Sequence, residues 1–295
     1  MLPKISIVTP NYNKGIYLEY TIKSVLSQNY PNLEYIIIDG GSTDNSLDII
    51  KKYESQLTYW VSEPDHGMYH AISKGFAKAT GEIMAWINSD DMYHPMCFFT
   101  IAEIFQSFPN VNWLVGANTA FDKYNRTILA KPSRYFSRID LLSNDYKWIQ
   151  QESTFWRRSL WEKVHGLNIN LKLAGDFDLW LRFSMHDKMY ITDSLIGGFR
   201  ILNEGQLTTN IDNYIKEIQT IINDHPISPK EKKKIKLLYL KRRINGLFNR
   251  INIFNTQAIY LWLMKNEKKE QDSHKITFSR KAQKFICNDT INHNN

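Results

Sequence analysis

The 295-residue sequence has few cysteines, no long hydrophobic run and no glycine-rich phosphate loop. Its two cysteines, Cys97 and Cys287, lie far apart and near no histidine cluster. They therefore indicate neither a disulfide framework nor a zinc site, and they suit a reducing compartment. No stretch of about 18 uncharged apolar residues occurs, so we expect no transmembrane helix. Residues 1–4 lead directly into a strand-like segment without a signal-peptide hydrophobic region, which favours a cytoplasmic location.

Charge is distributed unevenly along the chain. Residues 1–220 contain 21 Lys and Arg against 24 Asp and Glu, whereas residues 221–295 contain 16 against 6. The formal net charge of +7 is therefore a property of the C-terminal part, and the change in charge predicts a boundary. An apolar content of 43% and an aromatic content of 13% are typical of a folded core and not of a disordered chain.

Strand-like and helix-like segments alternate in the first part of the chain. Strand-like runs at residues 5–9, 33–39, 57–62 and 82–87 are separated by helical patterns at 17–28, 46–53 and 68–79. This alternation predicts an α/β fold with a mostly parallel sheet and helical crossovers. Further along we expect helices at 96–107, 159–166 and 176–186, strands at 111–118 and 190–201, and only helices from about residue 208.

Polar side chains follow the first four predicted strands. The segments are "TPNYN" (9–13), "DGGSTDNS" (39–46), "SEPDHGMYH" (62–70) and "NSDD" (88–91). The carboxyl ends of parallel strands meet at one edge of a sheet, where open α/β sheets bind ligands. Neither Gly-x-Gly-x-x-Gly nor Gly-x-x-x-x-Gly-Lys is present, so a bound phosphate needs another source of positive charge. Adjacent acids that hold Mg²⁺ or Mn²⁺ can supply it, although a single acid after a strand is more often a turn or capping residue.

The order of these segments resembles that of family-2 glycosyltransferases. The similarity runs through "SIVTPNYN", "TIKSVLSQNYPNLEYIIIDGGSTDNS" and "EPDHGMYHAISKGFAKATGEIMAWINSDD", and it covers about residues 3–205. It implies a GT-A fold, which is a Rossmann-like nucleotide-binding sheet with helices on both faces, followed here by a C-terminal helical region. It also implies a metal-dependent, inverting transfer of a sugar from a nucleotide-diphosphate donor.

The resemblance implies roles for individual donor-site residues. It places Thr9, Pro10 and Tyr12 around the nucleobase, Asp39 against the base, Asp65 and Gly67 along the nucleotide, and Asn88 and Ser89 in the metal-binding Asp-x-Asp segment. Asp90 is the expected ligand of Mn²⁺ or Mg²⁺, with Asp91 as a second acid beside it. The sequence departs from the family pattern at Asn88, which replaces the first acid, so metal affinity and donor choice are less defined.

A second acidic segment, "LKLAGDFDLWLRF" (171–183), begins a predicted helix. An inverting transfer needs a base that takes a proton from the acceptor hydroxyl. The resemblance assigns this role to Asp176, whereas Asp178 points elsewhere around the helix. Both acids also suit a helix N-terminus without any catalytic role. The residues expected on the acceptor side, for sugar stacking and hydrogen bonding, are Trp148, Gln151 and Glu152.

These expectations divide the chain into three parts. Residues 1–206 form the catalytic domain, with a nucleotide-sugar half at about 1–92 and an acceptor half at about 93–206. A basic helical region follows at 207–270, and residues 271–295 are expected to form a flexible tail. The predicted enzyme moves a sugar, with UDP-sugar favoured, to a lipid-linked or oligosaccharide acceptor in O-antigen, capsule or exopolysaccharide synthesis.

Two other functions and two uses of the basic helices stay open. A sugar-nucleotide nucleotidyltransferase also binds a nucleotide on such a sheet, but it is expected to carry a glycine-rich, basic loop where this chain has "TPNYNKG". An inactive nucleotide- or sugar-binding scaffold is compatible with Asn88. The basic helices either contact an anionic membrane surface peripherally or cap the catalytic domain, and nucleic-acid binding is disfavoured.

Overall fold

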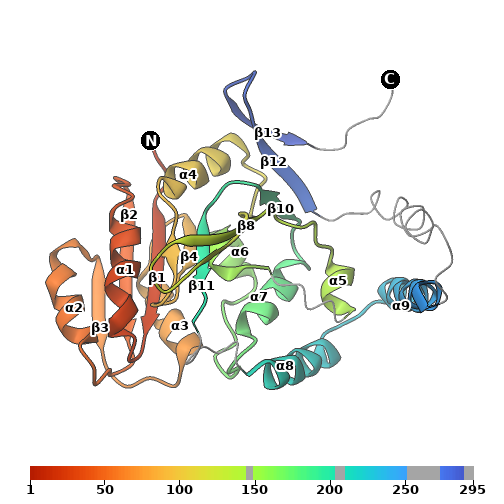
Figure 1. Cartoon of the computed structure of the whole chain (residues 1–295), viewed down its shortest axis with the longest axis horizontal. Coiled ribbons are helices and arrows are strands. Elements are labelled where there is room, and N and C mark those ends of the chain that lie inside the picture. The colour runs from red at the N-terminus through yellow and green to blue at the C-terminus, as the bar shows by residue number, and fades with distance from the viewer. Residues whose placement is uncertain (144–148, 203–209, 251–272, 289–295) are drawn as a thin grey trace.

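The computed structural model describes residues 1–143, 149–202, 210–250 and 273–288. Two sheets form the body of the protein, one of nine strands in the order β13-β12-β10-β6-β9-β4-β1-β2-β3 and one of four strands in the order β5-β11-β7-β8. Figure 1 shows β1 to β3 with α1 and α2 at one side of the molecule, and α8 and α9 at the other. The predicted α/β class is confirmed.

The elements follow one another in this order. The strands are β1 (Ile5–Asn11), β2 (Leu33–Asp39), β3 (Tyr59–Ser62), β4 (Ile83–Trp86), β5 (Met92–Tyr93), β6 (Trp113–Val115), β7 (Asn118–Phe121), β8 (Thr127–Lys131), β9 (Thr154–Arg157), β10 (Met189–Thr192), β11 (Gly197–Arg200), β12 (Ser273–Ser279) and β13 (Lys284–Asn288). The helices are α1 (Gly15–Leu26), α2 (Ser46–Tyr53), α3 (Met68–Lys78), α4 (Cys97–Ser107), α5 (Arg138–Leu142), α6 (Arg158–Lys163), α7 (Gly175–Phe183), α8 (Ile211–Asp224) and α9 (Pro229–Arg250). Two short 3₁₀ helices are η1 (Glu54–Gln56) and η2 (Gln151–Ser153).

The N-terminal part is a run of parallel strands with helical connections. β1 pairs in parallel with β2 and β4, and β2 pairs in parallel with β3. Every residue of β1 is buried, as expected for a strand covered on both faces of the sheet. α3 packs on β1 and β2 through buried residues that include Ile72 and Phe76. This packing holds α3 against β1 and β2, whose carboxyl ends lie side by side.

Two segments predicted as single strands are each divided between the two sheets. β6 and β10 pair in the large sheet, whereas their continuations, β7 and β11, pair in the small one. The main-chain N–H of Ala117 donates to Ser194 at this crossing, 2.9 Å away. A side chain at Gly116 would place its Cβ 2.4 Å from the Ile196 side chain, so only glycine allows the two segments to bend at the same level. The prediction of one strand at 111–118 and one at 190–201 was therefore wrong.

The helices after residue 209 pack against the preceding α/β part of the chain. α8 buries Ile218, Ile221 and Ile222. Arg138 of α5 ties the next helix to the domain, because its Nε donates to Glu231 of α9 at 2.6 Å and its Nη2 donates to the Pro226 carbonyl at 3.1 Å. No helix among the described residues is both long and apolar enough to cross a membrane.

The segment expected to be a flexible tail contains a β-hairpin. β12 pairs in parallel with β10, and β13 pairs antiparallel with β12, so the hairpin extends the nine-stranded sheet (Figure 1). Ile276 is fully buried, and Lys275 forms an ion pair with Asp193 at 2.6 Å. The predictions of a flexible tail and of an all-helical end are wrong for residues 273–288, because an uncovered edge of β10 recruits this segment.

Candidate active site

The ends of β1, β2 and β3 bring three polar residues into register. Asn11 lies opposite Asp39, and Asp39 lies opposite Ser62. The buried Asp39 carboxylate accepts hydrogen bonds from Asn11 Nδ2, Ser62 Oγ and Ser42 Oγ, each at 2.6 Å. It also accepts main-chain N–H bonds from Gly41 and Ser42 at 3.2 and 2.9 Å. Burial acts to raise the pKa of Asp39, but these hydrogen bonds outweigh it and leave the pKa below its usual value.

This saturation makes Asp39 a fixed anion that organises the rim. Both of its oxygens are engaged by the chain itself, and the bonds hold the "DGGS" turn against the end of β1. Sequence reasoning identified Asp39 but missed Asn11, Ser42 and Ser62, which satisfy it. These polar residues are visible in the segments "TPNYN", "DGGS" and "VSEP". However, only the register of the strands shows which of them face one another.

The predicted nucleobase residues fall into two groups. Thr9 and Pro10 are buried, and the Thr9 hydroxyl is 3.1 Å from the Tyr35 hydroxyl inside the fold. Tyr12 is 61% exposed, and its ring lies beside Gly40 together with the Asp65 carboxylate. An aromatic ring, a bare backbone and a carboxylate thus meet at the open side of the rim.

Asp65 and Gly67 form the turn that starts α3. The Asp65 Oδ1 accepts the main-chain N–H of Gly67 at 2.7 Å, and Gly67 has a φ of 113°, in the region that favours glycine. The turn therefore places Asp65 next to Tyr12 and leaves its Oδ2 directed toward Gly40.

The acid pair after β4 is held by residues from distant parts of the chain. Lys14 Nζ lies 3.0 Å from Asp90 Oδ2, and the Thr21 hydroxyl donates to the carbonyls of Ser89 and Asp91 at 3.0 and 2.7 Å. Asp91 is fully buried. Its Oδ1 accepts the main-chain N–H of Arg200 at 2.7 Å, and its Oδ2 accepts Asn88 Nδ2 at 3.2 Å.

Arg200 places a buried cation beneath this pair. Its Nε donates to the Asp90 carbonyl at 2.6 Å, and its guanidinium lies over the rings of Tyr17 and Tyr20. Burial lowers the pKa of Arg200, while the charges of Asp91 and Asp90 act in the opposite sense. This contact could not be predicted from the sequence, because Arg200 ends β11, over a hundred residues from the acids.

η2 adds a third buried carboxyl group. Glu152 shares a hydrogen bond with Asp91, and burial together with the neighbouring acids raises the pKa of both groups. The pair therefore retains a proton more readily than two separate acids would. Gln151 Nε2 donates to the Trp86 carbonyl at 2.6 Å, and its buried Oε1 has no partner among the described residues. Trp148 lies outside the described residues.

Asp176 occupies the start of α7. Burial raises its pKa to about 6, main-chain hydrogen bonds at the helix start oppose the shift, and the charge of Glu217 adds to it. Its Oδ1 is buried without a hydrogen-bonding partner in the part of the chain that is described. Asp178 differs, because its Oδ2 is bonded by Arg182 Nε and Nη2 at 2.9 and 2.6 Å. The negative charges of Asp176 and Asp90 both act on Glu152, so all these acids share one region.

The residues present fit a divalent cation at Asp90. Asn88 Oδ1 is buried with no partner among the described residues, and oxygen donors are what Mg²⁺ and Mn²⁺ prefer. The described residues contain no cluster of three or more His, Cys, Asp or Glu arranged for a metal. Mg²⁺ can be held by one or two protein oxygens plus substrate phosphates, and the residues that would provide them here are Asp90 and Asn88. Asp91 has both oxygens engaged by the chain, which leaves Asp90 as the better ligand.

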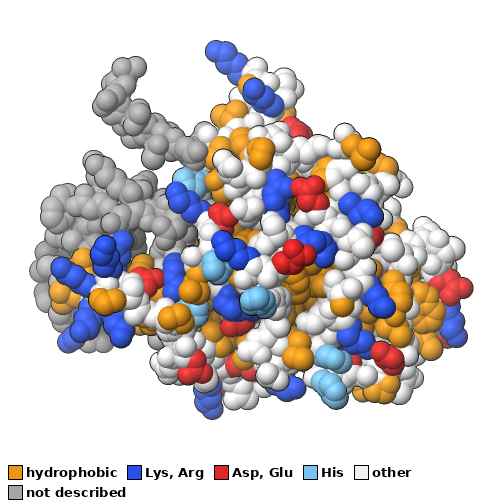
Figure 2. Space-filling model, turned by 180° about the vertical axis from the view of Figure 1, so that it is seen from behind, with side chains coloured by type: hydrophobic (Ala, Val, Ile, Leu, Met, Phe, Trp, Pro, Cys, Tyr) orange, Lys and Arg blue, Asp and Glu red, His pale blue; other side chains and the backbone are white. Residues whose placement is uncertain are grey.

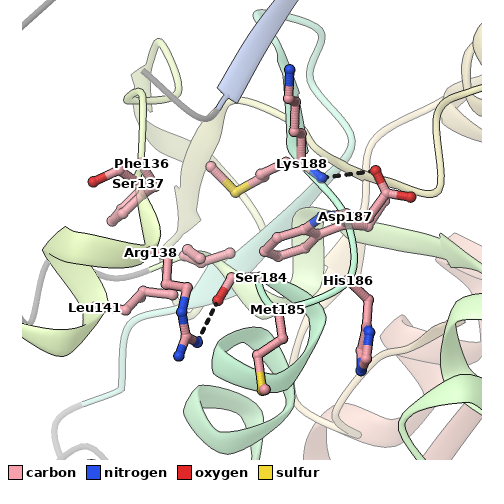
Figure 3. Close-up of a pocket in the computed structure, with 12 residues that line it drawn as sticks. Phe136, Ser137, Arg138, Leu141, Ser184, Met185, His186, Asp187 and Lys188 are labelled. Atoms are coloured by element: carbon pink, nitrogen blue, oxygen red, sulfur yellow. Dashed lines mark hydrogen bonds between the residues drawn. The ribbon is translucent and has the colours of Figure 1, made fainter. Parts of the chain in front are cut away.

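A separate cavity of about 440 Å³ lies away from this rim (Figure 3). Trp113 and Met189, which line it, begin β6 and β10, so it lies at the amino ends of these strands. Arg138 of α5 and Ser184, at the end of α7, contribute to the same wall and are joined by a 3.4 Å hydrogen bond. Because the predicted acids follow strand carboxyl ends, this cavity belongs to a different face.

Comparison with known proteins agrees with this architecture. Residues 6–164 match the model of the Glycosyl transferase family 2. An uncharacterised glycosyltransferase of Rickettsia typhi is 26% identical over 225 residues, which cover 74% of this chain and 70% of that one. The putative teichuronic acid biosynthesis glycosyltransferase TuaG of Bacillus subtilis is 37% identical over 94 residues, covering 31% of this chain and 37% of its own.

Solved structures show the same fold. S. aureus TarS residues 1–349 in complex with UDP-GlcNAc superpose with a TM-score of 0.63 at 17% identity, covering 88% of this chain and 78% of that one. The mannosyltransferase PcManGT from Pyrobaculum calidifontis, in complex with GDP-Man and Mn²⁺, has a TM-score of 0.60 at 18% identity and covers 90% and 76%. With the family model matching more than half of its residues, this chain belongs to glycosyltransferase family 2.

Proposed function

We propose that the protein is an inverting, metal-dependent glycosyltransferase in which Asp176 is the catalytic base. The observation that carries this proposal is the Asp176 carboxyl group itself. Its Oδ1 is buried without a partner in the described structure, its pKa is raised to about 6, and it lies in the same region as Asp90. A carboxylate with these properties is ionised at neutral pH and takes up a proton more readily than an ordinary aspartate.

The reaction follows from these positions. Asp176 takes the proton of an acceptor hydroxyl, and the hydroxyl oxygen forms a bond to the anomeric carbon of the donor sugar. The bond from that carbon to the diphosphate oxygen breaks, and the nucleoside diphosphate leaves from the opposite side, so the configuration inverts. Asp90 and Asn88 would hold a divalent cation, which neutralises charge on the departing diphosphate. Arg200, Thr21 and Asp91 keep the Asp90 main chain in place.

We assign the donor preference to UDP-sugars. Tyr12 offers a ring for stacking a base, and the saturated Asp39 fixes the turn that carries Gly40 beside it. TarS, a structural neighbour, was solved with UDP-GlcNAc, whereas another neighbour carries GDP-Man. The proposed acceptor is a lipid-linked or oligosaccharide chain in O-antigen, capsule or exopolysaccharide synthesis, which accords with the name of TuaG.

We also propose that α9 contacts an anionic membrane surface peripherally from the cytoplasm. One side of α9 faces the domain, because Glu231 pairs with Arg138 and Ile235 packs on the core. The outer side carries exposed Leu237 and Leu240 at 52% and 53% exposure, and Figure 2 shows Lys and Arg side chains gathered around hydrophobic ones in this region. Apolar residues surrounded by basic ones suit an anionic lipid interface. The sequence also predicts lipid-facing positions at Leu238, Leu247, Phe248 and Ile251. Leu238 is half-buried, contrary to this prediction, and the side chains of the other three lie outside the described part of the chain.

One screen tests the donor site and identifies the nucleobase of the donor. UDP, GDP, dTDP and CMP are each added with and without Mn²⁺ while thermal unfolding is followed, first for the wild type and then for Asp90→Ala. A metal-dependent rise in Tm for one nucleoside diphosphate, absent in Asp90→Ala, is the expected result. No metal-dependent shift with any nucleotide would contradict the proposal and favour an inactive scaffold.

Two further assays separate the remaining alternatives. Turnover that releases pyrophosphate instead of a nucleoside diphosphate would identify a nucleotidyltransferase. Sedimentation with vesicles of anionic phospholipid, compared with neutral vesicles, tests the membrane contact. Binding to the anionic vesicles that is lost when Leu237 and Leu240 are both changed to Glu is the expected result, and equal recovery of wild type and variant would refute it.

A further inference from the structure

α8 places a carboxylate directly against the segment that leads into the proposed base. Glu217 Oε2 accepts the main-chain N–H groups of Leu173 and Ala174 at 2.7 and 2.6 Å, and its Oε1 accepts the N–H of Lys172 at 2.9 Å. Three successive amides thus converge on one side chain. Hydrogen bonds to a charged acceptor are stronger than neutral ones, so this contact fixes the 172–174 backbone firmly.

The same backbone is held from its other side by α3. The Tyr69 hydroxyl donates to the Leu173 carbonyl at 2.7 Å. Gly175 packs against the Tyr69 ring so closely that a Cβ there would lie 2.7 Å from the ring edge. Residues 172–175 are therefore held between α8 and α3, and the next residue is Asp176.

α8 itself has little freedom to move. Ile218, adjacent to Glu217, is 1% exposed, and Ile221 and Ile222 are also buried. The carboxylate is consequently presented by a helix that is packed into the core of the domain, although α8 lies beyond the residues that match the family model. A connection through a flexible side chain on an unpacked helix could not fix a backbone in this way.

We propose that Glu217 is a positioning residue for Asp176: by binding the main-chain N–H groups of residues 172–174, it holds the start of α7 and keeps the Asp176 carboxylate in place. The proposal rests on the proposed role of Asp176 as base. It makes α8 part of the catalytic apparatus and gives the C-terminal region a second task besides covering the domain.

The electrostatic surroundings of Asp176 support this role. Glu217 of α8 bears the negative charge that faces it and raises its pKa, after burial as the larger cause. Tyr69 of α3 and Tyr214 of α8 are near enough to feel the Asp176 charge, and so is Glu152 of η2. On α7 itself, Asp178 is paired with Arg182. Glu217 is thus the facing group whose removal changes charge without touching the acid pair.

The test compares Glu217→Gln with Glu217→Asp and with Asp212→Asn, an exposed acid on the same helix. The full-length chain is labelled with ¹³C at aspartate carboxyl groups, and the Asp176 signal is assigned by its absence in Asp176→Asn. Its titration is followed by NMR, which needs no acceptor. In parallel, UDP release from UDP-GlcNAc and GDP release from GDP-mannose are measured with Mn²⁺ across pH 4.5–8.5, and the circular dichroism spectrum checks folding.

We expect the Asp176 titration in Glu217→Gln to move to lower pH, with no shift in Asp212→Asn. Turnover falls about tenfold to a hundredfold, since small misplacements of a catalytic group cost that much, while the donor KM stays within about twofold. In Glu217→Asp, which keeps the charge, the midpoint of the Asp176 titration should lie between those of the wild type and Glu217→Gln. An unchanged Asp176 titration in a folded Glu217→Gln variant would overturn the inference. Full activity of Asp176→Asn would instead overturn the proposed base, and the NMR result would still report on Glu217.

Discussion

Replacing Asp176 with Asn removes the proposed base while keeping its shape and its ability to accept main-chain hydrogen bonds. General-base catalysis contributes about 10²–10⁴-fold to rates, so we expect turnover to fall by at least about a hundredfold, with little change in donor KM. The assay is release of nucleoside diphosphate from the donor that raises Tm in the nucleotide screen. The matched control is Asp178→Asn, which removes an acid two residues away that is already bonded to Arg182.

The pH dependence of the wild-type rate gives a second test of the role of Asp176. With a pKa of about 6, Asp176 is about 90% ionised at pH 7 and about 10% ionised at pH 5. The rate at pH 5 should therefore be about one tenth of that at pH 7. An aspartate at the ordinary value of 3.8 would be about 94% ionised at pH 5, and the rate would hardly change. A flat profile between pH 5 and 7 would contradict the role of Asp176.

The same substitution should stabilise the fold. A carboxyl group whose pKa is raised in the folded state binds protons there more tightly than in the unfolded chain, so stability is lost as pH rises from about 4 to 6. The pKa difference corresponds to about 3 kcal/mol. Asp176 has a buried Oδ1 but is only half-buried as a whole residue, so solvent screening reduces this to about 1–2 kcal/mol. We therefore expect Asp176→Asn to raise Tm by about 2–8 °C at pH 8 and not at pH 4. A lower Tm at pH 8 would refute the idea that burial destabilises the charged group.

Three other substitutions test the surrounding structure. Asp90→Ala should abolish the Mn²⁺-dependent part of nucleotide binding, whereas the exposed Asp48→Ala should leave it unchanged in a calorimetric titration. Lys14→Met removes the cation that lies 3.0 Å from Asp90, so the Mn²⁺ affinity measured by the same titration should rise about tenfold, and an unchanged affinity would show that the ion pair does not compete. Ile276→Ala should destabilise the protein by about 2–5 kcal/mol in urea unfolding, because Ile276 is fully buried. Ile286→Ala, in the other strand of the hairpin, should cost much less, because Ile286 is 36% exposed. Equal effects of the two changes would show that the hairpin does not pack as described.

Much of the N-terminal sheet is predictable because local sequence and tertiary structure agree there. The run "LEYIIID" is centred on three consecutive β-branched isoleucines, which suit a strand buried on both faces, and α2 covers the predicted residues, Ser46 to Tyr53. The polar residues directly follow parallel strands, whose carboxyl ends lie at one edge of the sheet, so these residues are expected close together. Asp39 and Asp90 could therefore be identified as candidates from their places after strands, whereas Asp176, at the start of a helix, was identified through the resemblance to family-2 glycosyltransferases.

Other elements could not be assigned because long-range contacts decide them. The sequences of 111–118 and 190–201 are strand-like throughout, and only the meeting of Gly116 with Ile196 divides them between two sheets. In the first strand of the hairpin, apolar Ile276 and Phe278 alternate with polar residues, and the second strand contains the apolar run 285–287. Two such short strands do not form a stable sheet alone. They become strands because β10 provides an edge.

The contacts that hold the acids in place were the hardest feature to predict from the sequence. Asp91, Asp90 and Asp176 are each held by a residue that comes from a different element: the main chain of Arg200, the side chain of Lys14 and, through the preceding backbone, Glu217. Each of these residues looks ordinary in its own segment, since a Lys before a helix, an Arg at a strand end and a Glu on an amphipathic helix are common. Burial of several like charges together is costly unless such partners exist. A sequence that places adjacent acids after a buried strand therefore predicts that distant cations and amides surround them, even though it does not say which ones.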